Sequence, residues 1–120
     1  MRVLIVEDDP GVGRLLRMLL ERDGHEAVLA EDGARGWRGL TGPAVPQLLI
    51  LDVMLPDMDG TDLLARVRAD HRMAALPVLL VTADRTSGAL EDGALTRVLG
   101  KPFDLADFRA ALSALASRAR

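Results

Sequence analysis

The chain contains no cysteine and no tyrosine, and aromatic residues make up 2% of it. The absence of cysteine excludes a disulfide framework and a thiolate zinc site. Few aromatic rings and a net charge of −3 argue against nucleic-acid binding by this domain alone. No apolar run reaches the roughly 18 residues that a membrane span needs, and no signal-peptide pattern is visible, so we expect a cytoplasmic protein.

Lysine is almost absent as well. Among the 15 basic residues, Lys101 is the single lysine. Because Arg fills the other basic positions, this lysine indicates a role that needs a compact, flexible ammonium rather than a planar guanidinium. A chain of 120 residues with 49% hydrophobic residues is long enough for one core, so we expect residues 1–120 to form a single domain.

Short apolar runs that alternate with amphipathic segments predict an α/β protein. The run that ends at Asp52 lies between Pro46 and Pro56, which leaves too little length for a buried helix and favours a strand buried on both faces. The predicted strands cover residues 3–6, 26–30, 48–52, 77–82 and 97–100. Helices are expected to begin at Pro10, after Asp32, at Asp59 or Gly60 and after Asp104, with a shorter one over residues 87–92.

Helical spacing also predicts which side chains face the core. Leu15 and Leu105 belong to apolar faces of their helices, and Trp37 is expected to be a core residue. Asp57 and Asp59 are expected to build the turn after the third strand and to cap the helix that follows it.

Three acids are predicted to meet at one edge of the sheet. Right-handed crossovers bring the carboxyl ends of parallel strands together, where Glu7 and Asp8 follow the first strand and Asp52 ends the third. Two such charges about 4 Å apart repel by roughly 4 kcal/mol at an effective dielectric near 20. A cluster of this kind takes up protons or binds a cation. Its hard oxygens suit Mg²⁺, with the main-chain carbonyl of Met54 as a further ligand.

Two further residues at the same edge suggest what the acids do. A phosphoryl group on Asp52 would bring negative charge, which Mg²⁺, the Lys101 ammonium and the Thr82 hydroxyl can neutralise. An aspartate carboxylate is a known nucleophile that forms aspartyl phosphate. Because carboxylates are poor nucleophiles, the donor has to be a high-energy phosphoryl compound such as phosphohistidine.

Four motifs, VEDDP, LDVMLPDMDG, VTA and KPF, stand in this order at the predicted strand ends. Together they resemble a response-regulator receiver domain of two-component signalling, similar to the chemotaxis response regulators, over essentially the whole chain. The resemblance implies a flavodoxin-like, doubly wound α/β fold, in which helices flank a five-stranded parallel sheet of order 2-1-3-4-5. It also implies a cis peptide bond between Lys101 and Pro102.

The resemblance assigns a role to each of the clustered residues. Asp52 would be the phosphoacceptor, and Mg²⁺, or Mn²⁺ in its place, would be the cofactor. The other roles implied are direct metal ligand for Asp8, a mostly water-mediated ligand for Glu7, a carbonyl ligand for Met54 and a phosphate-sensing pair for Thr82 and Lys101.

The implied partners are a sensor histidine kinase and a downstream effector protein or fused output domain, with no membrane partner. The domain would not be an enzyme, beyond catalysing its own phosphoryl transfer and dephosphorylation. Dimerisation through the last helix stays open.

The chain departs from the family pattern in two places. Val98 occupies the switch position, three residues before Lys101, where the family usually has an aromatic residue. The segment from Thr82 to Lys101 is about three residues shorter than is usual in the family, so a short or irregular fourth helix is expected. Both departures put the usual coupling of Thr82 to an aromatic ring in doubt.

Four alternative functions compete with this interpretation. An aspartate-nucleophile phosphatase resembles D-x-D, and here the second acid is replaced by Met54. A P-loop nucleotidase requires G-x-x-x-x-G-K-[ST], which the chain lacks. A nucleotide-binding domain needs an anion-friendly first loop, whereas Glu7 and Asp8 repel phosphate. A receiver-like module without phosphorylation stays open, because Val98 favours it and the complete acid, Thr and Lys set opposes it.

Overall fold

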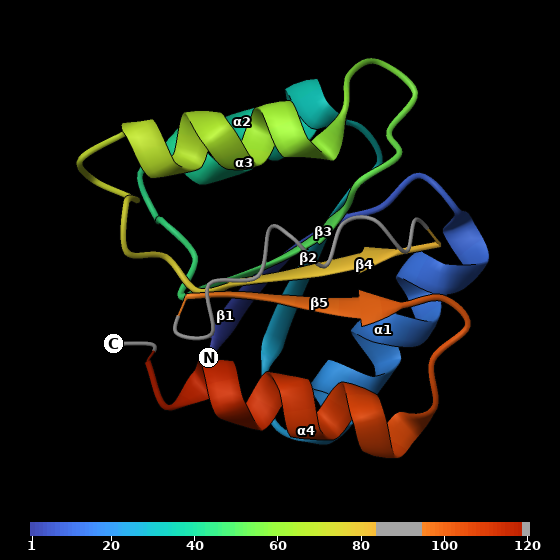
Figure 1. The fold of residues 1–120 in the computed structure, drawn as a ribbon. Helices are drawn as coiled ribbons and strands as arrows, with labels where there is room; N and C mark the ends of the chain where they lie inside the picture. Colours follow the sequence, from blue (N-terminus) through green and yellow to red (C-terminus); the bar gives the residue numbers. More distant parts are fainter. Residues whose placement is uncertain (84–94, 119–120) are drawn as a thin grey trace.

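The computed structural model describes residues 1–83 and 95–118 of the chain. Within these residues, a five-stranded parallel sheet in the order β2-β1-β3-β4-β5 lies between two layers of helices (Figure 1). The strands are β1 (Arg2–Val6), β2 (Glu26–Ala30), β3 (Leu48–Asp52), β4 (Val78–Thr82) and β5 (Thr96–Gly100). The helices are α1 (Pro10–Arg22), α2 (Gly33–Thr41), α3 (Gly60–Ala69) and α4 (Leu105–Ala116). The predicted fold class and strand order are therefore confirmed, while the predicted helix over residues 87–92 lies outside the described residues.

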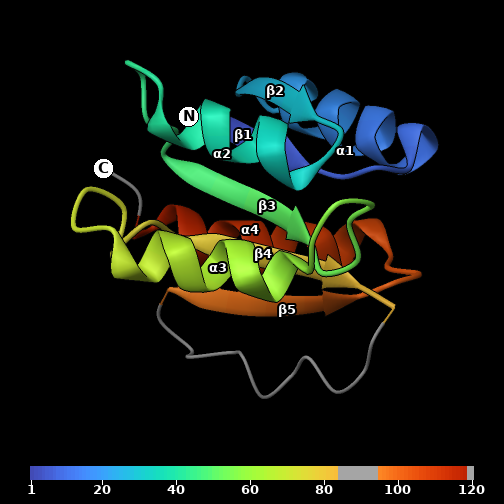
Figure 2. The ribbon, with the colours of Figure 1, turned by 90° about the horizontal axis from the view of Figure 1, so that it is seen from above.

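The central strands are apolar throughout because both faces of the sheet are covered. Successive residues of β1 point to opposite faces of the sheet, so that Ile5 and Val6 enter two separate cores. One core lies under α1 and α4, where Phe108 is its largest fully buried side chain, and the other lies under α2 and α3. Figure 2, seen from above, shows α2 and α3 on the near face of the sheet, with β3 visible between them. The glycine-rich α2 fits here because Gly36 lets its backbone approach Val6, where a β-carbon would collide.

Helix starts agree closely with the sequence because they depend on local chemistry. Asp9 accepts hydrogen bonds from the backbone N–H of Gly11 (2.8 Å) and Val12 (3.3 Å), and Pro10 is the first residue of α1. Asp32 and Asp104 cap α2 and α4 in the same manner. The predicted N-caps of these three helices are confirmed.

The starts of three strands shift by one residue. β1 begins at Arg2 rather than Val3. Pro77 lies outside β4, because proline has no N–H to donate, although its carbonyl still accepts the N–H of Leu49 at 3.0 Å. β5 begins at Thr96 rather than Arg97, since the carbonyl of Leu95 already accepts the N–H of Val78 at 2.7 Å.

Two predicted core positions were wrong. Leu15 and Leu105 are 43% and 41% exposed, because each lies at the margin of its helix's apolar stripe. Trp37 is partly buried and packs against the core under α2 and α3 as predicted, with the guanidinium of Arg66 in α3 stacked 4.6 Å from the centre of its ring. Among the described residues, no helix is both long and apolar enough to cross a lipid bilayer.

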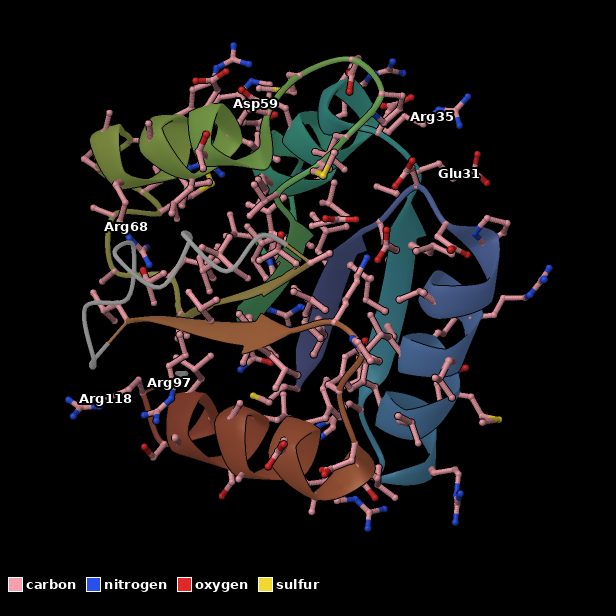
Figure 3. The ribbon with its side chains drawn as sticks, turned by 45° about the vertical axis from the view of Figure 1, so that its right-hand side comes forward. Glu31, Arg35, Asp59, Arg68, Arg97 and Arg118 are labelled. Atoms are coloured by element: carbon pink, nitrogen blue, oxygen red, sulfur yellow. The ribbon has the colours of Figure 1, made fainter. Side chains whose placement is uncertain are left out.

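Arg68, near the end of α3, links this helix by hydrogen bonds to the segment before β4 and to the start of β5. Figure 3 shows its side chain between α3 and β5. Its guanidinium donates to the carbonyls of Ala74 (3.2 Å), Leu76 (2.6 Å) and Leu95 (3.1 Å) and to the hydroxyl of Thr96 (2.7 Å). One side chain therefore donates to acceptors that precede β4 in the chain and to acceptors at the start of β5.

We expect Arg68→Ala to lower the free energy of unfolding by about 2–3 kcal/mol, because a partly buried acceptor left without its donor costs about 1–3 kcal/mol. Urea denaturation measures the change. Arg72→Ala, at an exposed position shortly after α3, is the control and should stay within about 0.5 kcal/mol of the wild type. Equal stabilities of the two variants would mean that the guanidinium contacts do not stabilise the fold.

Candidate metal and phosphoryl site

The three acids predicted to cluster do meet at the carboxyl edge of the sheet. Glu7 follows β1 directly and Asp52 ends β3, and the parallel register that pairs Val6 with Leu51 brings the two acids to neighbouring positions. Glu7 is 2% exposed and Asp52 is 6% exposed, whereas Asp8 is exposed to solvent. One carboxylate oxygen from each acid lies within 4.8 Å of the other two.

Lys101 enters this cluster from the far end of the chain. Its Nζ donates to Oε1 of Glu7 at 2.6 Å and to Oδ2 of Asp52 at 2.9 Å. Its backbone N–H donates to the carbonyl of Thr82 at 2.8 Å, so the start of the β5–α4 loop is held against the end of β4. The peptide bond between Lys101 and Pro102 is cis, as the resemblance implied.

The electrostatics of the cluster follow from its burial. The pKa of Glu7 is raised to about 7, first by burial and then by the neighbouring Asp52, while the Lys101 ammonium lowers it. Burial alone would lower the pKa of Lys101, but its hydrogen bonds to Glu7 and Asp52 outweigh this, so that its pKa is raised. Lys101 is therefore a cation at neutral pH, and its ammonium lies between Asp52 and Glu7, whose raised pKa leaves Glu7 partly protonated at that pH.

The carboxylate of Asp52 is held at both oxygens. Oδ1 accepts the backbone N–H of Met54 at 3.0 Å, while Oδ2 accepts the Lys101 ammonium. Gly60, the first residue of α3, packs over the backbone of this strand end, where a β-carbon would collide with the Asp52 carbonyl. Both oxygens of this carboxylate therefore have fixed hydrogen-bond partners.

Thr82 lies beside the cluster at the end of β4, whereas Val98 lies in the middle of β5, the edge strand beyond β4. Thr82 ends β4 and is 1% exposed, one residue beyond Val81, the register partner of Asp52. Val98 pairs with Leu80 and packs, partly buried, against the core under α2 and α3. The structure places both residues where the sequence predicted them, at the end of β4 and within β5.

The donor set fits a hard divalent cation. Glu7, Asp8 and Asp52 offer oxygen ligands only, from two adjacent strand ends, and the exposed Asp8 leaves one side of the cluster open. Mg²⁺ prefers few carboxylates together with waters and phosphate oxygens. The observed cluster meets this requirement.

One sequence expectation in this region was wrong. Asp57 does not cap α3, the helix that follows it. Its two carboxylate oxygens instead accept the backbone N–H groups of Gly33 (2.8 Å) and Ala34 (2.9 Å) at the start of α2. Asp59 occupies the N-cap position of α3 but makes no side-chain cap hydrogen bond. No local sequence signal announces the Asp57 contact, because its partners lie more than twenty residues away along the chain.

Comparisons with known proteins agree with the geometry. The family model described as the response regulator receiver domain matches residues 3–113. The DNA-binding dual master transcriptional regulator RpaA of Synechocystis is 38% identical over 122 residues, which covers 98% of this chain and 49% of RpaA. Chemotaxis protein CheY1 of Helicobacter pylori is 38% identical over 85 residues, which covers 70% of this chain and 68% of that protein.

A solved structure gives the same result. The non-phosphorylated HemR receiver domain from Leptospira biflexa superposes with a TM-score of 0.82 at 34% identity, covering 99% of this chain and 96% of that one. The chain spans about half the length of RpaA, the transcriptional regulator compared above.

Proposed function

The chain belongs to the response regulator receiver domain family of two-component signalling, and from this premise we propose that residues 1–120 form a domain whose phosphoacceptor is Asp52. The observation that carries the proposal is the Asp52 carboxylate, buried, bonded at both oxygens and 2.9 Å from the Lys101 ammonium. We assign Glu7, Asp8, Asp52 and the Met54 carbonyl as ligands of Mg²⁺, or of Mn²⁺ in its place. Thr82 and Lys101 are assigned to the phosphoryl oxygens.

The proposed transfer is a displacement at phosphorus. A carboxylate oxygen of Asp52 forms a bond to the phosphorus atom while the bond from phosphorus to the donor breaks. With a phosphohistidine of a sensor kinase as the donor, the electron pair returns to an imidazole nitrogen. A bound Mg²⁺ would supply positive charge for the phosphoryl oxygens. Lys101, already aimed at Oδ2 of Asp52, would supply a second cation without having to move far.

The reset reaction uses the same residues. Water attacks phosphorus, the bond between phosphorus and the Asp52 oxygen breaks, and inorganic phosphate leaves with the carboxylate restored. In this proposal the domain catalyses only these steps on itself. The added charge on Asp52 changes its surface for a downstream effector or a fused output domain. Because Val98 has no ring to move inward, we expect the signal to leave the domain by a rearrangement that does not depend on an aromatic side chain at this position.

The proposal is tested by weighing the intact protein after treatment with a small acyl phosphate donor. We expect a gain of one phosphoryl group in the presence of Mg²⁺ and no gain when EDTA removes the metal. Absence of any gain with Mg²⁺, in a protein shown to be folded by circular dichroism, would contradict the proposed function.

A further inference from the structure

The loop between Asp52 and α3 is closed at its base. The N–H of Gly60 donates to the carbonyl of Val53 at 2.6 Å, and Met54 and Asp59 form an isolated antiparallel bridge. Between these residues the chain leaves the sheet and returns. The backbone of Met54, a proposed metal ligand, therefore belongs to the first turn of this loop.

Burial fixes only part of the rest of the loop. Leu55 and Met58 are partly buried against the core under α2 and α3, whereas Pro56, Asp57 and Asp59 are exposed and Met54 is 66% exposed. Each residue of an unrestrained loop gains about 1–2 kcal/mol of conformational entropy relative to a fixed one. A loop that carries a metal ligand needs some other restraint to keep that ligand in place.

That restraint comes from α2. Figure 3 shows the loop after β3 passing close to the start of α2. The Asp57 carboxylate accepts the N–H groups of Gly33 and Ala34, which have no acceptor within the helix. These hydrogen bonds hold the pKa of Asp57 below its ordinary value, so the contact is made by an ionised carboxylate. Met58 adds a packing contact, since a β-carbon at Gly33 would collide with its Sδ and Cγ.

The contact between Asp57 and α2 is not the only side-chain cap of this helix among the described residues. Asp32 already serves the helix from its own N-cap position by accepting the N–H of Arg35 at 2.7 Å. Asp57 takes a different pair of N–H groups and joins two segments that are distant in the chain. The two acids thus offer a direct comparison, because both cap α2 while only Asp57 also holds the loop.

We propose that Asp57 is a positioning residue for the metal site, which fixes the loop to α2 so that the Met54 carbonyl is in place before Mg²⁺ binds. The inference rests on the proposed function, because the ligand it positions belongs to that site. Asp57 does not touch the metal or the phosphoryl group. It acts by lowering the ordering cost that binding would otherwise carry.

Calorimetric titration of Mg²⁺ into Asp57→Ala and Asp32→Ala tests the proposal. Residues that orient metal ligands typically change metal affinity about 10–100-fold, so we expect Asp57→Ala to weaken Mg²⁺ binding about tenfold. Asp32→Ala, which also removes a cap from α2, should bind Mg²⁺ like the wild type. Asp57→Asn keeps one acceptor oxygen and should give a smaller loss, which keeps the test available if the alanine variant does not fold.

Amide hydrogen exchange in the metal-free protein gives a second measurement. We expect the amides of Met54 and Gly60 to exchange faster in the Asp57 variants and to be unaffected in Asp32→Ala. Equal Mg²⁺ affinities and equal exchange in all variants would make Asp57 a helix cap only and overturn the inference. Failure of the wild type itself to bind Mg²⁺ would instead contradict the proposed function, so the two outcomes are distinguishable.

Discussion

Asp52→Asn is expected to abolish phosphoryl transfer while leaving the fold intact. The amide has nearly the shape of the carboxylate, and its oxygen can still accept the N–H of Met54 or the Lys101 ammonium. It has no anionic oxygen to attack phosphorus, so the nucleophile alone is removed. Intact-mass measurement after treatment with the phosphodonor and Mg²⁺ should show a single unmodified species.

The matched control is Asp59→Asn. Asp59 is an exposed carboxylate in the loop after β3, with no side-chain cap hydrogen bond, so its loss should leave the mass gain unchanged. Labelling of Asp52→Asn to the same extent as the wild type would show that another acid accepts the group. It would also leave the buried carboxylate of Asp52 without the role assigned to it.

Lys101→Met is expected to change phosphoryl transfer and metal binding in opposite directions. Losing a preorganised donor to developing negative charge typically costs about 10²–10³-fold in rate, and we expect a loss of this size for phosphorylation. Mg²⁺ affinity should rise, because Glu7 and Asp52 then have no other cation beside them. The rate of mass gain and calorimetric titration measure the two effects.

A charge-conserving substitution separates charge from shape at this position. Lys101→Arg keeps a cation but replaces the compact ammonium with a planar guanidinium. We expect Lys101→Arg to lose the gain in Mg²⁺ affinity that Lys101→Met shows, while its rate of phosphorylation stays below that of the wild type. A wild-type rate of phosphorylation in Lys101→Met would contradict the role given to this lysine.

The acidic cluster could be predicted because its residues lie at strand ends. There, the sequence identifies the strands, and the strand order determines which ends are neighbours. Once β1 and β3 are parallel neighbours, Glu7 and Asp52 must be close, whatever their side chains do. Lys101 was identified by its rarity among many arginines, and its partners confirm that it enters the acidic cluster. Position at a strand end was enough to predict the two acids, and residue type was enough to single out the lysine.

Contacts that depend on tertiary packing could not be predicted. Asp57 stands shortly before α3, so local rules assign it to that helix, yet folding brings the amides of α2 closer. The contacts of Arg68 also depend on tertiary packing, because its acceptors lie in the segment before β4 and at the start of β5. Leu15 shows the limit of helical spacing, which identifies an apolar stripe but not where its margin meets solvent.

The most direct test of the central claim is to locate the phosphoryl group chemically. Borohydride reduces an acyl phosphate of aspartate to homoserine, so peptide sequencing by mass spectrometry of the reduced, phosphorylated protein identifies the acceptor. We predict homoserine at position 52 alone, in samples phosphorylated with Mg²⁺ and not in those treated with EDTA. Homoserine at Asp8, Asp57 or Asp59 instead would contradict the assignment of Asp52 as the phosphoacceptor.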